Sequence, residues 1–183
     1  MDNKISEQRQ LIEACKRNDT EAKKKLYELY APVMFGICVR YVKEKESAKD
    51  ILQEGFIKIF TKIDDYSGAG SFEAWMKKIF VTTALEHLRS AKVWRSNISM
   101  EDYNETIVDN FDVSMVSQLS ADEILKYINE LPTGFRTVFN LYAIEGYSHA
   151  EIARMLKIKE ASSRSQLARA RQLLQNKIQK LYL

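Results

Sequence analysis

The stretch that decides the fold runs from Ser148 to Arg171 and reads SHAEIARMLKIKEASSRSQLARAR. Ser148 and Glu151 have the Ser-x-x-Glu spacing of a capping box, in which each side chain bonds the other residue's free backbone N–H. Apolar residues recur at helical spacing on both sides of a break at 157–159. They are Ile152, Ala153 and Leu156 before the break and Leu167, Ala170, Leu174 and Ile178 after it. The pattern predicts two helices joined by a tight turn.

The second of these expected helices has a polar and basic face opposite its apolar one. That face carries Ser162, Arg164, Ser165, Ala168, Arg169 and Gln172. From Ala161 to Leu183 the chain has five Lys or Arg residues and no Asp or Glu. The combination fits a helix-turn-helix whose second helix lies in the DNA major groove, although a basic face can also be no more than a solvated surface.

Composition favours an all-α protein and gives no support for a zinc site. The 183 residues allow one or two domains, and the two Pro and six Gly favour helices. No apolar run approaches the roughly 20 residues that span a bilayer, and the first ten residues lack a signal-peptide core. Cys15 and Cys38 are isolated, which is typical of a reducing cytoplasm. His87 and His149 have no metal-ligand spacing.

An acidic segment divides the chain. From Ser96 to Ala121 there are five Asp or Glu residues and no Lys, Arg or His, and no helical stripe is present. We therefore expect two helical domains, 1–94 and 121–183, joined by a flexible linker at 95–120. The segment is either a plain tether or an acidic strand that occupies a basic channel on a partner, and composition favours the tether.

The first domain is expected to begin with two helices. The first runs from Ile5 to about residue 17, and Asp19 or Thr20 caps the second. The second should turn four residues inward: Leu26, Tyr27, Leu29 and Tyr30. Pro32 predicts a break or kink, after which the apolar residues 33–41 should form the buried centre of the domain.

The next expected helix, ESAKDILQEGFIKIFTKI at 46–63, separates an apolar face from a polar one. Asp50, Gln53 and Glu54 lie at i, i+3 and i+4, so they share one outward face. That face is either ordinary solvated surface or a docking site for a basic partner. A metal site at Asp50 and Glu54 would need further carboxylates.

Residues 64–71 form an expected loop with two glycines, and Ser71 can cap the helix that follows. That helix has a basic flank that includes Lys77 and Lys78. An aromatic loop beside a basic helix suits single-stranded nucleic acid, which needs stacking surfaces and phosphate neutralisation. Tyr66 on the loop is the better stacking candidate, since Trp75 at helical spacing fits a core position.

Together these stretches resemble a bacterial extracytoplasmic-function (ECF) RNA polymerase sigma factor of the sigma-70 family. The family's Asp-x-x-Gln-Glu corresponds to residues 50–54, and its Gly-x-x-x-Phe-x-x-Trp-like passage to 68–75. Leu131-Pro132 resembles the opening of region 4, EGYSHAEIA at 145–153 its helix-turn-helix entry, and SQLARAR at 165–171 its closing segment. Each motif is weak alone, but their order and separation are specific.

The resemblance implies a role for each candidate residue. Asp50, Gln53 and Glu54 would dock on the β′ coiled coil of core RNA polymerase, which the protein also contacts through the β subunit. The −10 element would be melted and held by Tyr66, Ser67, Trp75, Lys77 and Lys78. The −35 element would be read by Ser162, Arg164, Ser165, Ala168, Arg169 and Arg171. The linker would run through the polymerase cleft, an anti-sigma factor would restrain the protein, and no cofactor or catalytic residue is implied.

Four residues depart from the family's pattern. Lys157 stands where the turn commonly has Gly, and a left-handed Lys would cost about 1 kcal/mol. Ser163 places a hydroxyl where an apolar contact is expected, Gln166 replaces a common Arg, and Thr82 replaces a common Asn. These departures bear on which −35 and −10 sequences are bound.

Two other functions are compatible with parts of the chain. A stand-alone helix-turn-helix regulator would bind an operator without polymerase, usually as a dimer, but no dimerisation heptad is present. A carboxylate-based nuclease using Asp50 and Glu54 would need a complete set of metal ligands, which the sequence does not provide.

Overall fold

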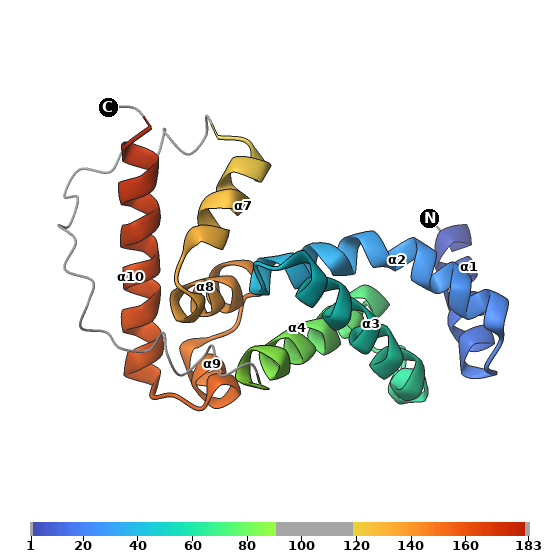
Figure 1. The fold of residues 1–183 in the computed structure, drawn as a ribbon. Helices are drawn as coiled ribbons and strands as arrows, with labels where there is room; N and C mark the ends of the chain where they lie inside the picture. The colour runs from blue at the N-terminus through green and yellow to red at the C-terminus, as the bar shows by residue number, and fades with distance from the viewer. Residues whose placement is uncertain (1, 91–118, 182–183) are drawn as a thin grey trace. The chain divides into compact units, whose positions relative to one another are not determined.

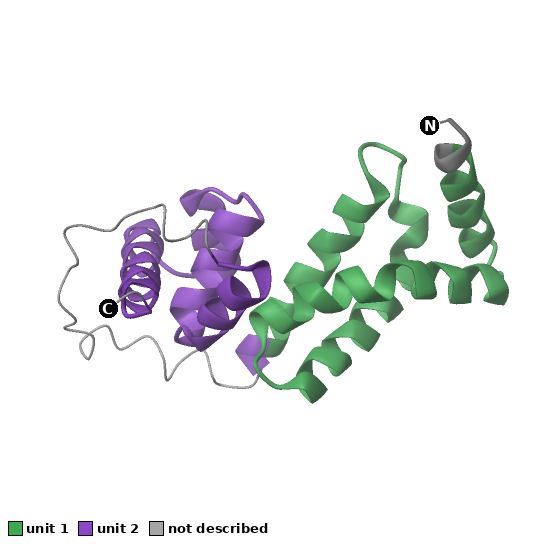
Figure 2. Ribbon diagram, turned by 90° about the horizontal axis from the view of Figure 1, so that it is seen from above, with its two compact units in different colours: residues 1–87 green, residues 88–183 purple. Residues whose placement is uncertain are grey.

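The structure is a computed structural model that describes residues 2–90 and 119–181. The described residues form helices and no strand, which confirms the all-α prediction. Their contacts divide the chain into two compact units, 1–87 and 88–183 (Figure 2). Most of the expected acidic linker, 95–118, lies outside the described residues.

Unit 1 is built from four α-helices, whose order along the chain is shown in Figure 1. They are α1 (Asp2–Lys16), α2 (Thr20–Tyr41), α3 (Lys45–Lys62) and α4 (Phe72–Ser90), with a short 3-10 turn η1 at Ile63–Asp65. The predicted cap of α2 is confirmed at Asp19, whose carboxylate accepts from the Ala22 backbone N–H at 2.8 Å. This bond satisfies one of the N–H groups that a helix start leaves without an internal partner.

The structure corrects two expectations about α2. Of the break or kink expected at Pro32, the break does not occur, because the helix continues through that residue. Pro32 cannot donate a hydrogen bond to the Glu28 carbonyl, and both residues are exposed, so the missing bond falls on the outer side of the helix. Tyr27 and Leu29 are also exposed, Leu29 by 58%, because the buried stripe runs instead through Leu26 and its neighbours further along the helix. Those neighbours are Tyr30, Met34, Ile37, Cys38 and Tyr41.

An aromatic group centred on the buried Phe56 of α3 extends from the core of unit 1 to its surface. Its ring lies 4.7 Å from Tyr27, 6.0 Å from Phe60 and 5.4 Å from Phe80 of α4, the last in an edge-to-face arrangement. Gly55 lies beside Phe80: a Cβ at that position would be 2.2 Å from the Phe80 ring. The missing side chain therefore allows α3 and α4 to approach closely directly beneath the polar face of α3.

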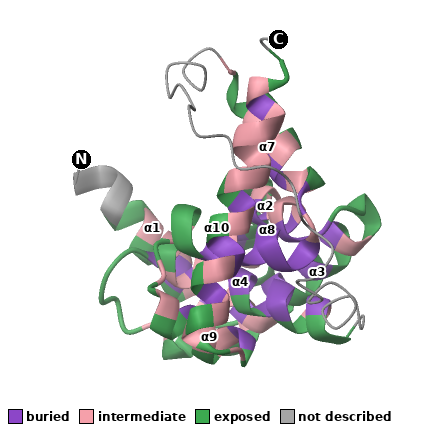
Figure 3. Ribbon diagram, turned by 90° about the vertical axis from the view of Figure 1, so that its left-hand side faces the viewer, coloured by how far each residue is buried: buried purple, intermediate pink, exposed green. Residues whose placement is uncertain are grey.

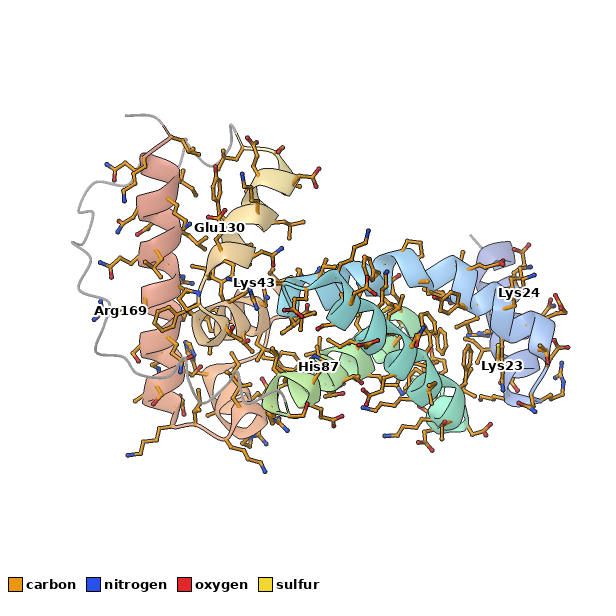
Figure 4. The ribbon with its side chains drawn as sticks, in the orientation of Figure 1. Lys23, Lys24, Lys43, His87, Glu130 and Arg169 are labelled. Atoms are coloured by element: carbon orange, nitrogen blue, oxygen red, sulfur yellow. The ribbon has the colours of Figure 1, made fainter. Side chains whose placement is uncertain are left out.

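Unit 2 contains α7 (Ala121–Glu130), α8 (Thr133–Phe139), a π-helical segment η3 (Asn140–Ile144), α9 (His149–Leu156) and α10 (Glu160–Gln179). Leu131, Phe135 and Ala170 form its buried centre, against which Phe139, Leu173 and Leu174 pack. Residues 133–138 of α8 are all buried (Figure 3), and the buried residues of α10 are Ser163, Gln166, Leu167, Ala170 and Ile178. Lys177 of α10 pairs with Glu130 of α7. Figure 4 labels Glu130.

The predicted helix-turn-helix is confirmed in α9 and α10. Ser148 and Glu151 form both halves of the capping box at the start of α9. Lys157 ends that helix in the left-handed conformation, with φ 55° and ψ 44°, as its place in the motif predicts. Ile152 and Leu156 of α9 are buried, as are Leu167 and Ala170 of α10, so the two apolar stripes face inward.

Candidate nucleic-acid interface

The three polar residues predicted to share a face of α3 are all exposed. Asp50, Gln53 and Glu54 project from the helix, while Ile51, Leu52 and Phe56 on its other side are buried. This arrangement follows from the period of the helix, which separates the two sets. The face is therefore available to a partner and carries two carboxylates.

Lys58 connects one of these carboxylates to α4. Its Nζ lies 2.7 Å from Glu54 Oε1, 2.6 Å from Glu86 Oε2 and 3.3 Å from Thr83 Oγ1. Burial lowers the pKa of Lys58, but the hydrogen bonds and charges of Glu54 and Glu86 outweigh it and raise the pKa above its ordinary value. Lys58 thus fixes Glu54 against the body of unit 1 and leaves Asp50 as the less neutralised acid.

Ile57 adds an apolar member to the face, which the sequence reasoning missed. It is 65% exposed and lies four residues after Gln53, one helical turn along the same side of α3. The helical spacing alone could have placed it there. An exposed Ile among carboxylates and an amide is a mixed surface of the kind found where proteins associate.

The loop after α3 holds Tyr66 against the start of α4. The Tyr66 ring lies 5.0 Å from the Phe72 ring and 5.6 Å from the Trp75 ring, and its hydroxyl donates to the Gly70 carbonyl at 2.8 Å. Gly68 and Gly70 have φ of 82° and 79°, a left-handed conformation that side chains disfavour. The Tyr66 ring, which is the predicted stacking candidate, is therefore half-buried and held in position by these contacts.

The loop and α1 enclose a cavity of about 460 Å³. Tyr66, Ser67 and Phe72 line it from the loop side, with Gly68, Gly70 and Ser71. The other wall comes from α1 and consists of Gln8, Arg9, Ile12, Glu13 and Lys16. Of the residues predicted to hold −10 DNA, Tyr66 and Ser67 line this cavity and Trp75, Lys77 and Lys78 do not.

The two basic residues predicted beside the loop lie on α4. Lys77 pairs with Glu73 at 2.7 Å, one turn earlier on the same helix, and Lys78 is exposed. Exposed pairs of this kind contribute little to stability. Both ammonium groups therefore lie at the surface of α4. A DNA phosphate could replace Glu73 as the partner of Lys77 and could bind Lys78 directly.

The predicted reading face of α10 lies on the outside of the helix. Arg164 and Ala168 are exposed, and Ser162, Ser165 and Arg169 are partly exposed. Arg164 pairs with Glu160 one turn earlier. Figure 4 shows the Arg169 side chain projecting from α10 away from α7 and α8. The face therefore combines hydroxyl, methyl and guanidinium groups, which can read base edges in a major groove.

Arg171 is engaged within unit 2. Its guanidinium lies over the Tyr142 ring, 5.8 Å from the centroid. Tyr142 in turn contacts α9 of the helix-turn-helix. The Tyr142 and His149 rings stack at 4.5 Å, and His149 Nδ1 lies 2.9 Å from Ser163 Oγ. The chain of contacts joins η3, α9 and α10, so Arg171 contributes to the packing of the motif.

The Ser163–His149 contact explains one departure from the family's pattern. Ser163 is fully buried, where an unbonded hydroxyl would be costly. The imidazole of His149 supplies the hydrogen bond, so a polar pair occupies an otherwise apolar interface. Gln166 is also buried, which keeps its amide away from the exposed face of α10.

An apolar groove of about 310 Å³ lies between α7 and α10. Ile124, Tyr127, Ile128, Phe139, Leu174 and Ile178 line it, together with Arg171 and Gln175. Of these residues, the sequence analysis assigned Leu174 and Ile178 to packing and Arg171 to −35 DNA, and it did not foresee an open groove.

Two features are absent from the part of the chain that the structure describes, residues 2–90 and 119–181. No helix there has both the length and the apolar character needed to cross a membrane. No group of three His, Cys, Asp or Glu residues there lies close enough together to hold a metal ion.

Two protein families match the chain. Sigma-70 region 2 matches residues 26–93, and Sigma-70 region 4 matches residues 121–174. The RNA polymerase sigma-H factor of Pseudomonas aeruginosa is 28% identical and covers 94% of each chain. The ECF RNA polymerase sigma-E factor of Haemophilus influenzae is 29% identical over 93% of this chain and 95% of its own. Among solved structures, the fold is similar to that of the sigma factor RpoE in complex with the anti-sigma factor NepR from Bartonella quintana. The TM-score is 0.51 at 20% identity, over 86% of this chain and 96% of that one.

Proposed function

The chain belongs to the sigma-70 family as an ECF sigma factor, and from that premise we propose which of its surfaces bind polymerase and which bind the promoter. As a sigma factor it associates with core RNA polymerase and directs promoter-specific initiation. The observation that carries the assignment is the presence of both regions in one chain, in the family's order. A stand-alone operator-binding regulator would have no use for region 2. We assign region 2 to residues 1–94, the linker to 95–120 and region 4 to 121–183.

Asp50, Gln53 and Glu54 are the proposed contacts to the β′ coiled coil. They are exposed together on a rigid helix that Gly55 allows to pack tightly on α4. Carboxylates pair well with basic groups of a partner, and the exposed Ile57 adds apolar area to the contact. Glu54 already pairs with Lys58, so its charge would be shared between Lys58 and the basic partner. Asp50 is therefore the stronger electrostatic contact in this proposal.

The loop cavity is the proposed site for a base extruded from the −10 element. Extrusion costs a few kcal/mol, which stacking and pocket hydrogen bonds offset. The fixed Tyr66 ring and the two left-handed glycines give the cavity a preformed wall, so little ordering remains to be done on binding. Lys77 and Lys78 would attract the neighbouring phosphates, with Trp75 supporting the Tyr66 ring from behind.

The outer face of α10 is the proposed reader of the −35 element in duplex form. Arg164 and Arg169 are the candidates for paired contacts with guanine, and Ser162, Ser165 and Ala168 allow the helix to approach the bases closely. Arg171 supports the motif through Tyr142.

The apolar groove between α7 and α10 is the proposed contact of region 4 with the β subunit. Its lining fits the apolar side of a partner helix, a common mode of recognition. Like the relative from Bartonella quintana, the chain is expected to bind an anti-sigma factor. It acts in the cytoplasm, where the polymerase is, and it performs no chemistry of its own.

The docking assignment is tested by charge reversal. Asp50→Lys with Glu54→Lys should abolish co-purification with core polymerase while leaving the far-UV circular dichroism unchanged, because both side chains are exposed. The control Glu21→Lys with Glu28→Lys changes the same charge on exposed positions of α2 and should retain binding. Wild-type affinity in the first variant would remove its residues from the interface.

A further inference from the structure

We propose that helix α1 forms part of the nucleotide site. In this proposal Arg9 binds the phosphate of the nucleotide whose base is extruded into the loop cavity. The inference rests on the proposed function of that cavity. It goes beyond the region 2 match, which begins at residue 26 and therefore leaves out the whole of α1. In the sequence, helices α2 and α3 separate α1 from the loop, so α1 and the loop meet only in the folded unit.

The cavity has the size and the two kinds of wall that a nucleotide requires. Its volume of about 460 Å³ lies within the range of about 300–1,000 Å³ typical of small-molecule sites. The loop wall offers the Tyr66 and Phe72 rings and the backbone of two glycines, which suits a flat base. The α1 wall is polar and charged, which suits the sugar-phosphate part.

Three of the polar groups on the α1 wall already have partners. Gln8 Nε2 donates to the Tyr30 hydroxyl at 2.5 Å. Lys16 Nζ lies 3.1 Å from Glu13 Oε1 and donates to the Tyr66 carbonyl at 3.4 Å. Lys16 thus ties α1 to the loop, and Glu13 is balanced by it.

Arg9 differs from these neighbours. It is exposed, it lines the cavity, and it makes no hydrogen bond or ion pair with another residue of the described chain. Because the Lys16–Glu13 pair is internally balanced, the guanidinium of Arg9 gives the cavity a net positive charge. A guanidinium forms paired, charge-assisted hydrogen bonds with phosphate. The geometry therefore places a phosphate-binding group opposite the wall that suits the base.

The test compares Arg9→Gln with Arg17→Gln. Arg17 is an exposed arginine just after α1 that does not line the cavity, so both changes remove the same charge from the same part of the unit. Each variant is assembled with core polymerase. Binding is measured to a forked promoter fragment whose −10 non-template strand is single-stranded, over a range of salt concentrations. The same fragment is then used with one −10 phosphate at a time replaced by a neutral methylphosphonate.

Arg9→Gln should weaken binding about tenfold, as expected for a lost hydrogen bond to a charged group, and lower the salt slope by about 0.7. Arg17→Gln should change neither by more than about twofold. One methylphosphonate position should weaken the wild type and leave Arg9→Gln unaffected, which identifies the phosphate. Arg9→Lys should recover part of the affinity, because it keeps the charge and loses the paired geometry.

Equal losses for the two glutamine variants, or methylphosphonate effects that are the same in wild type and Arg9→Gln at every position, would overturn the inference alone. A wild-type holoenzyme that binds the forked fragment no better than a fragment without −10 single-stranded DNA would instead overturn the proposed function of the cavity, and the inference with it.

Discussion

Gly55→Ala should destabilise unit 1, although alanine is the better helix former. A Cβ at residue 55 would lie 2.2, 2.6 and 2.7 Å from three carbons of the Phe80 ring. Unstrained carbon contacts are about 3.5–4.0 Å, so the ring or its helix must move by about 1 Å. Phe80 is fully buried and in edge contact with Phe56, so it has little room to move.

The expected change is the difference between two opposing effects. Overpacking a close contact costs about 1–3 kcal/mol, and replacing a helical Gly by Ala returns about 0.5–1 kcal/mol. Gly55→Ala should therefore lower the free energy of unfolding by about 1 kcal/mol at the middle of both ranges, and by about 2.5 kcal/mol at most. Gly36 of α2 is the matched control, because a Cβ there would meet no atom within 4 Å. Gly36→Ala should raise stability by about 0.5–1 kcal/mol.

The assay is urea unfolding followed by tryptophan fluorescence in a Trp94→Phe background. Trp75 then reports alone, and its ring stacks on Phe72 within unit 1 at 5.5 Å. The m-value should be the same in all variants, so that midpoints can be compared directly. If Gly55→Ala were as stable as Gly36→Ala, the close packing of α3 on α4 would not be a feature of the folded protein.

Lys157→Gly should raise the unfolding midpoint of unit 2, measured by calorimetry, because the left-handed Lys costs about 1 kcal/mol that glycine avoids; an unchanged midpoint would mean that the turn is not left-handed. Burial raises the pKa of Cys38 to about 12, so iodoacetamide at pH 8 should label this thiol only after unfolding; rapid labelling of the folded chain would contradict its burial. In a library of −35 variants transcribed by holoenzyme, Arg164→Ala and Arg169→Ala should relax preference at particular positions. Arg171→Ala should weaken all sequences alike, and identical base profiles for the three variants would refute this division.

Features that depend on neighbours along one helix were predictable from the sequence. The capping box of Ser148 and Glu151 needs only a three-residue spacing, and the left-handed Lys157 needs only its place in the turn. The shared face of Asp50, Gln53 and Glu54 follows from the helical period alone.

Features that depend on how helices meet were not predictable in this way. On α2, Leu26 and Tyr30 are buried as predicted, but Tyr27 and Leu29 are exposed. The composition cannot separate the two pairs, because a hydrophobic side chain on the surface is ordinary. The break expected at Pro32 does not occur, and the sequence alone could not show that this proline lies on the exposed side of α2.

The α1 wall of the cavity is the largest omission at the site. Lys16 and Tyr66 are 50 residues apart and meet only when η1 packs on α1. The Ser163–His149 hydrogen bond was missed for the same reason, since it joins two helices across the turn.

In vitro transcription of fragmented genomic DNA, with core polymerase and with or without this protein, tests the central claim most directly. Sequencing of the RNA 5′ ends locates every start. The assignment as a promoter-directing factor predicts discrete starts that require both the protein and core, preceded by shared −10 and −35 sequences. These starts should disappear when Asp50 and Glu54 are both replaced by Lys. Specific DNA binding by the protein alone, with no new transcript starts when core is present, would contradict the assignment.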